Sequence, residues 1–78
     1  MPVNYFEAAN WYKKAIAQGA DSGQAQLHLA GLYENGLGVQ KNLSEAINLY
    51  RTVVEKYGNS KDAGEAKTRL ASIQSRGT

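Results

Sequence analysis

Apolar residues in the middle of the chain recur at helical spacing. Within residues 24–35 they stand at Ala25, Leu29, Leu32 and Tyr33, and within residues 42–57 they form a longer stripe. Apolar positions three and four residues apart line one face of an α-helix. The pattern therefore predicts two helices, and the short segment between them predicts that they pack antiparallel.

Two glycines and an asparagine punctuate this pair of helices. Gly36 and Gly38 follow the first helix, and glycine reaches positive φ angles without a Cβ clash, so we expect the helix to end at Gly36 in the left-handed conformation. Asn42 precedes the second helix and can cap it, with Glu45 reaching back as in a capping box. Val39, between turn and helix, is expected to fill the gap between the two helices.

Both halves of this unit occur twice. Residues 4–14 align with residues 42–52 at an offset of 38, and residues 21–36 align with residues 62–77 at an offset of 41. A period near 40 is typical of helical solenoids. The sequence predicts one domain over residues 1–78 with helices at about 4–18, 22–35, 42–57 and 61–75.

The predicted fold class is all-α, with two helix-turn-helix repeats in an open right-handed stack. The first three residues correspond to the loop around Val39, so the chain is expected to begin within a repeat and to be a segment of a longer array.

The residues around the glycine turn resemble the Sel-one-like repeat family, a relative of the tetratricopeptide repeat. The residues that carry the resemblance are Ala25, Leu29, Tyr33, Gly36, Gly38 and Val39, continued by Ala46 and Tyr50, and residues 8–15 of the first copy are similar. Residues 53–73 look more like an ordinary tetratricopeptide repeat. The resemblance implies an α-α superhelical scaffold that binds proteins or peptides, commonly in bacterial multi-protein assemblies.

Composition narrows the classes of function. Nine basic and seven acidic residues give a net charge of +2, and the lysines form no basic stripe, so nucleic acid is not an expected partner. The chain has no cysteine, and no apolar run approaches the roughly 20 residues that span a membrane. We expect a soluble protein without membrane insertion, in either the cytoplasm or the periplasm.

No residues combine into a catalytic or metal site. His28 is the only histidine and lies off the apolar stripe, so we expect it at the surface or facing a groove. The Gly36–Gly38 segment lacks the glycine spacing and the preceding strand of a phosphate loop. The sequence predicts no enzyme, cofactor or metal.

The helix before the glycine turn is expected to line an inner surface that binds a protein or peptide. Its candidate contact residues lie off the stripe at Gln24, Leu27, His28, Gly31 and Glu34, and the fourth helix would add Glu65, Thr68, Arg69 and Ser72. The alternative is that these are ordinary solvent-facing positions. A solvated face is also expected at Asp21, Glu34, Glu45, Lys13, Lys14 and Arg51.

The first helix supplies a second candidate surface. Phe6 and the side near Tyr5 and Ala9 are expected to stay bare and to dock the upstream part of a parent protein or a second copy. In the alternative, the first helix packs against both the second and third helices in a closed bundle. Trp11 is expected either to pack against the second helix or to cap the open end. Protein–protein interaction is the predicted function, and self-assembly through exposed repeat ends is the alternative.

Overall fold

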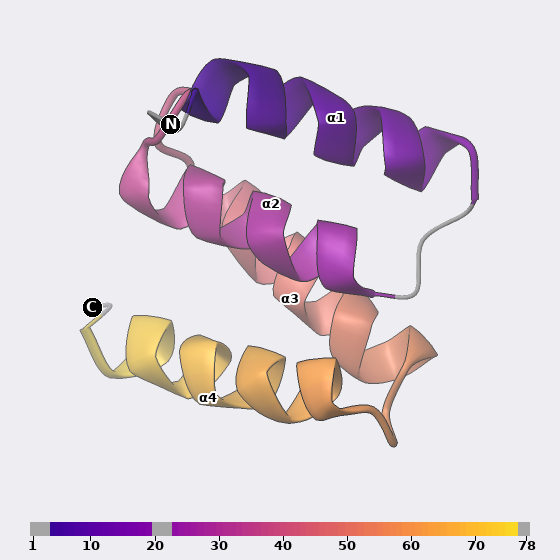
Figure 1. Cartoon of the computed structure of the whole chain (residues 1–78). Coiled ribbons are helices and arrows are strands. Elements are labelled where there is room, and N and C mark those ends of the chain that lie inside the picture. Colours follow the sequence, from indigo (N-terminus) through magenta and orange to yellow (C-terminus); the bar gives the residue numbers. More distant parts are fainter. Residues whose placement is uncertain (1–3, 20–22, 77–78) are drawn as a thin grey trace.

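The computed structural model describes residues 4–19 and 23–76 and consists there of four α-helices (Figure 1). The helices are α1 (Tyr5–Ala17), α2 (Gln24–Asn35), α3 (Leu43–Lys56) and α4 (Lys61–Arg76). The predicted all-α repeat fold is confirmed, and the helix ends lie within two residues of those expected. Residue 22, where the second helix was expected to begin, lies outside the described residues, as do Asp21 and residues 1–3.

Each helix packs against the next one along the chain, so α1 and α4 form the two edges of the stack (Figure 1). The backbones of α1 and α3 do not pack on each other, and α2 and α4 touch over a short stretch only. The closed bundle, in which the first helix covers the third, is therefore wrong. In this open stack, α1 and α3 leave a space over α2, and α2 and α4 leave a space over α3.

Asparagine caps begin two of the helices. Asn4 Oδ1 accepts a hydrogen bond of 3.1 Å from the Glu7 N–H, and Asn42 Oδ1 accepts one of 3.1 Å from the Glu45 N–H. Both satisfy amides that a helix start leaves free. The return bond predicted from Glu45 is wrong, because the Asn42 N–H donates to the carbonyl of Tyr33 at 2.9 Å. That bond ties the end of α2 to the beginning of α3.

The two glycines of the turn after α2 have different structural roles. Gly36 ends α2 with φ +67°, as predicted, and its N–H donates to the Leu32 carbonyl. Gly38 has φ +73° and lies against the backbone at the beginning of α1, where a Cβ would overlap the Tyr5 carbonyl group. The turn thus brings the loop onto α1, and only glycine fits there.

The core consists of two clusters. The larger joins α2, α3 and α4 through Tyr50, Val53 and fully buried alanines at positions 30, 46, 63 and 66. Alanine allows the helix backbones to approach closely. The smaller cluster joins α1 to α2 through Ala9, Leu29 and Leu32, with Val39 packed against it. The prediction that Ala9 stays bare is wrong, because this residue is the point at which α1 meets α2.

Candidate functional site

A groove between α2 and α4 is the candidate binding site, and we refer to it as the inner groove. Its volume is about 170 Å³. The α2 wall carries His28, Gly31 and Asn35, the α4 wall carries Glu65 and Arg69, and Leu27 and Tyr50 form its base. The groove exists because both walls pack on α3 and diverge from each other.

The inner groove unites part of the predicted contact surface. Leu27, His28, Gly31, Glu65 and Arg69 line it together. Gln24, Thr68 and Ser72 are exposed but are not among its lining residues. Sequence reasoning missed Asn35, which lies one helical turn after Gly31 on the same face, and its side-chain amide donates to the Gly31 carbonyl at 3.0 Å. That spacing of four residues was the signal that could have found it.

The observed position of Glu34 differs from the predicted one. Glu34 was expected on a solvated, partner-facing surface, but it is only 6% exposed. Glu34 follows Leu27 by seven residues and Ala30 by four, so it shares their face of α2, which packs toward α3. Its Oε1 accepts a hydrogen bond of 2.8 Å from the Tyr50 hydroxyl. Its position in the core makes Glu34 part of the support beneath the groove.

Charged residues around Tyr50 shift the pKa of this side chain at the base of the inner groove. Burial, the hydrogen bond to Glu34 and the charge of Glu34 all raise the pKa of the Tyr50 hydroxyl above its ordinary value. The Arg69 guanidinium acts in the opposite direction and Glu65 in the same direction, so both charges of α4 act on the base of the groove. Arg69 is exposed and lines the groove. Its guanidinium carries five N–H donors.

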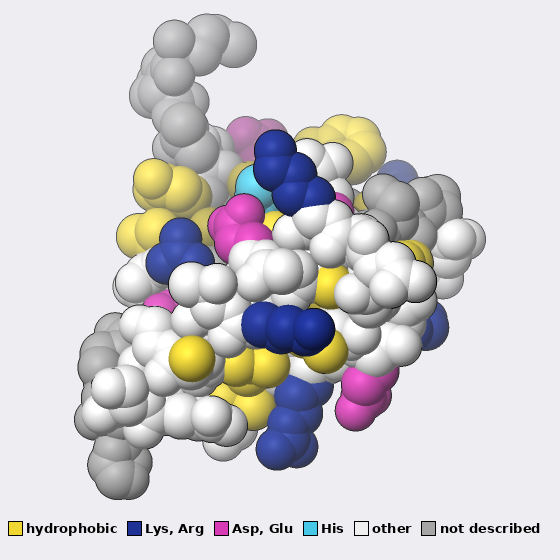
Figure 2. Space-filling model, turned by 90° about the horizontal axis from the view of Figure 1, so that it is seen from below, with side chains coloured by type: hydrophobic (Ala, Val, Ile, Leu, Met, Phe, Trp, Pro, Cys, Tyr) yellow, Lys and Arg dark blue, Asp and Glu magenta, His cyan; other side chains and the backbone are white. Residues whose placement is uncertain are grey.

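His28 lies at the rim of the inner groove. It is exposed, as predicted, and its ring stacks on Tyr12 of α1 with centroids 5.5 Å apart and planes 17° apart. The stack holds the imidazole in place and half-buries Tyr12. Figure 2, seen from the α4 side, shows acidic and basic side chains close together on this face, with apolar atoms between the polar ones.

Two aromatic residues of α1 are exposed. Phe6 is 64% exposed and Trp11 is 66% exposed, with the Lys14 ammonium 5.5 Å from the Trp11 ring. The prediction that Trp11 packs against the second helix is wrong. Trp11 follows Ala9 by two residues, which turns its side chain about 200° around the helix and away from α2. Phe6 is bare, as expected.

Metal-binding clusters and membrane-spanning helices are both absent from residues 4–19 and 23–76. No three His, Cys, Asp or Glu side chains in these ranges lie close enough together to hold a metal ion. No helix there combines the length and the apolar character needed to cross a bilayer.

Comparison with known protein families gives one match. The family model of the Sel1 repeat matches residues 1–19 and 23–52. Neither a curated protein nor a solved structure matches the chain. The matched residues include α1, α2 and most of α3, so the α4 wall of the inner groove, with Glu65 and Arg69, lies outside the match.

Proposed function

Because this chain belongs to the Sel1 repeat family, whose repeats generally serve as protein-interaction scaffolds, we propose that it binds a segment of a partner protein in the inner groove and performs no catalysis. Repeats of this family are generally non-catalytic.

The observation that carries this proposal is the composition of the inner groove. Donors on Arg69 and His28 and acceptors on Glu65 surround an apolar base formed by Leu27 and the Tyr50 ring. A polypeptide segment offers the complementary set, with backbone N–H and C=O groups and an apolar side chain for the base.

The test uses peptides selected from a random display library on the immobilised chain. We expect Arg69→Glu to weaken their binding about tenfold, as measured by calorimetry. Gly31→Leu should weaken it as well, since a Cβ at Gly31 would lie 3.8 Å from the Tyr50 hydroxyl, an ordinary contact distance, and a longer side chain would extend into the groove. Arg51→Glu is the matched control, because Arg51 is exposed on α3 and does not line the groove. Equal binding to all variants would contradict the proposal.

Exposed aromatic residues favour self-association as a second candidate function. The repeat offset of 38 makes Trp11 the counterpart of Leu49, and Leu49 packs against the cluster that joins α1 and α2. In a longer stack of repeats, a neighbouring helix would therefore cover the side chain at this position. Trp11, however, is exposed. The partner in this case is a second copy of the chain, and the oligomeric state in solution tests it.

A further inference from the structure

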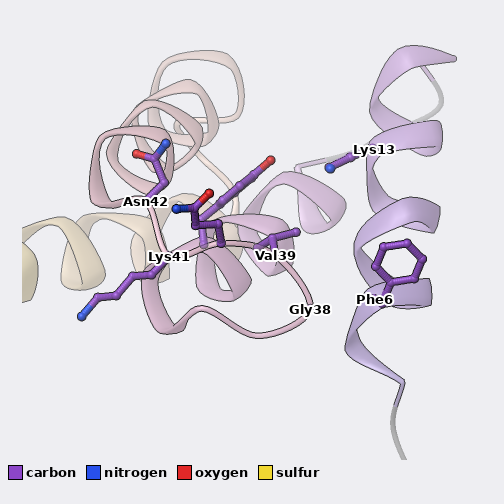
Figure 3. A pocket seen from close by; sticks show the side chains of 8 residues that line it. Phe6, Lys13, Gly38, Val39, Lys41 and Asn42 are labelled. Carbon is purple, nitrogen blue, oxygen red and sulfur yellow. The ribbon is translucent and has the colours of Figure 1, made fainter.

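A second groove runs along α2 between α1 and α3, and we refer to it as the outer groove. It is lined by Lys13, Ile16, Leu29, Tyr33, Glu45 and Leu49, with a volume of about 330 Å³. Lys13 and Tyr33 also border a further space of about 530 Å³ at the loop end, where Phe6, Val39 and Lys41 lie (Figure 3). The two spaces adjoin at these shared residues and form one continuous surface.

The outer groove is open because its walls do not meet. α1 and α3 both pack on α2, but their backbones make no contact with each other. Leu29 and Tyr33, one turn apart on α2, form the floor. Ala17 on α1 is too small to reach across, and Leu49 on α3 is only half-buried.

Apolar surface gathers in this groove. Ile16, Tyr33 and Leu49 each come from a different helix, and each is partly exposed. Isolated exposed apolar groups are normal on a protein surface. A concave set of them with a charged rim is typical of a contact site.

The charged residues of the outer groove lie on opposite walls, the cation on α1 and the anion on α3. Lys13 on α1 holds its Nζ 6.0 Å from the centroid of the Tyr33 ring, a distance at which the ring attracts the cation. Figure 3 shows Lys13 directed from α1 into the space, whereas the side chain of Lys41 points away from α1. Glu45 lies on the opposite wall, on α3. Lys13 is therefore the one cation among the described residues that line the outer groove.

We propose that the outer groove binds an acidic segment of a partner protein, with an apolar side chain over Ile16, Leu29 and Leu49 and a carboxylate against Lys13. Lys13 and Ile16 are about one turn apart on α1, a rise of about 5 Å. A helical segment matches this distance with its carboxylate three or four residues from the apolar anchor, and an extended segment matches it with two.

This site is independent of the inner groove. The two grooves share no lining residue, and they lie on different sides of α2. One chain could therefore hold two partner segments at once, and variants in one groove leave the other intact.

Selection with a competitor isolates ligands of this site. Random display peptides are panned on the immobilised parent chain with an excess of the soluble Lys13→Glu variant, which removes every peptide that does not depend on Lys13. The expected survivors carry Asp or Glu at the stated spacing from a large apolar residue. A synthetic survivor should bind Lys13→Glu about tenfold more weakly than the parent at low salt, and the difference should shrink as salt is added.

Matched controls decide the outcome. Lys14→Glu makes the same charge change on the neighbouring residue, which lies over Trp11 outside the groove, and should alter binding less than about twofold. A peptide with its acidic residue changed to Lys should regain binding to Lys13→Glu, which a misfolded variant would not allow. The proposal is overturned if no acidic peptides are enriched, if Lys14→Glu weakens binding equally, or if Arg69→Glu abolishes binding while Lys13→Glu does not.

Discussion

The Tyr50 hydroxyl of α3 donates a hydrogen bond of 2.8 Å to Glu34 Oε1 of α2, so the two central helices share a buried polar contact. Both side chains are almost fully buried, and a buried hydroxyl or carboxylate without a partner costs about 1–3 kcal/mol. The bond fixes the angle of the Tyr50 ring beneath the inner groove, and the charge of Glu34 favours the protonated phenol.

The pH dependence of stability follows from this pair. The pKa of Tyr50 is raised from its ordinary value of 10.0, first by burial and then by Glu34. Above pH 10 the unfolded chain releases this proton while the folded chain retains it, so stability falls as the pH rises, by up to about 1.4 kcal/mol per pH unit. We expect the melting temperature of Tyr50→Phe to fall less steeply than that of the parent between about pH 10 and pH 12. Tyr5→Phe makes the same change at an exposed tyrosine and is the matched control.

The helices could be predicted because their signals are local. Apolar spacing, the Asn42 cap and the Gly36 stop each act over a few residues, and the internal repeat applies the same pattern to all four helices. The sequence analysis predicted one apolar face for α2. This prediction is wrong, because the helix packs against α1, α3 and α4. Its buried side chains therefore surround most of the helix and include Gln26 and Glu34.

The inner groove was half predictable and the outer groove was not. His28 and Gly31 follow from helical position alone, and Arg69 follows from the repeat. Leu37, in the loop, lines the inner groove as well, and its position depends on how the turn packs. The outer groove depends on the distance between α1 and α3, which are separated by a whole helix and by a loop held against Tyr5 at Gly38. No local pattern encodes that distance.

Gly38 is the position at which we expect an added methyl group to be most harmful. Gly38→Ala would place a Cβ on a residue with positive φ and onto the Tyr5 carbonyl group, so we expect a loss of about 2 kcal/mol or more. Gly36→Ala should cost less, about 1 kcal/mol, because its nearest neighbour is the Lys41 side chain at 3.2 Å. Urea unfolding measures both.

Gly64→Ala is the control for that comparison. Gly64 lies inside α4, and among the described residues no atom outside its own turn of helix lies within 4 Å of the place that an added Cβ would occupy, so alanine should stabilise the helix by about 0.5 kcal/mol. A Gly38→Ala variant as stable as the parent would mean that the loop does not lie against α1.

Ala46 tests the close approach of α2 and α3. It is fully buried in the same cluster as Ala30 and Tyr50. Ala46→Leu should overpack this contact and cost about 1–3 kcal/mol, which lowers the melting temperature by several degrees. The exposed Ala71 of α4 provides the matched control, Ala71→Leu, with little expected change. An unchanged melting temperature for Ala46→Leu would refute the packing of α2 on α3.

Phe6 and Trp11 test the two exposed aromatic positions of α1. Both are about two-thirds exposed, so we expect Phe6→Ser and Trp11→Ser to change stability by no more than about 0.5 kcal/mol. Tyr12→Ser should cost clearly more, because Tyr12 is half-buried and stacks on His28.

Self-association gives the α1 edge a second, separate readout. Trp11 is the only tryptophan, so its fluorescence reports on the edge directly. If a second copy covers Trp11, the emission should shift to shorter wavelength as protein concentration rises, in step with the mass measured by light scattering. Phe6→Ser should abolish the increase in mass without lowering the melting temperature. A large fall in melting temperature, with a monomer before and after the substitution, would instead make Phe6 part of the core and remove the case for self-assembly through α1.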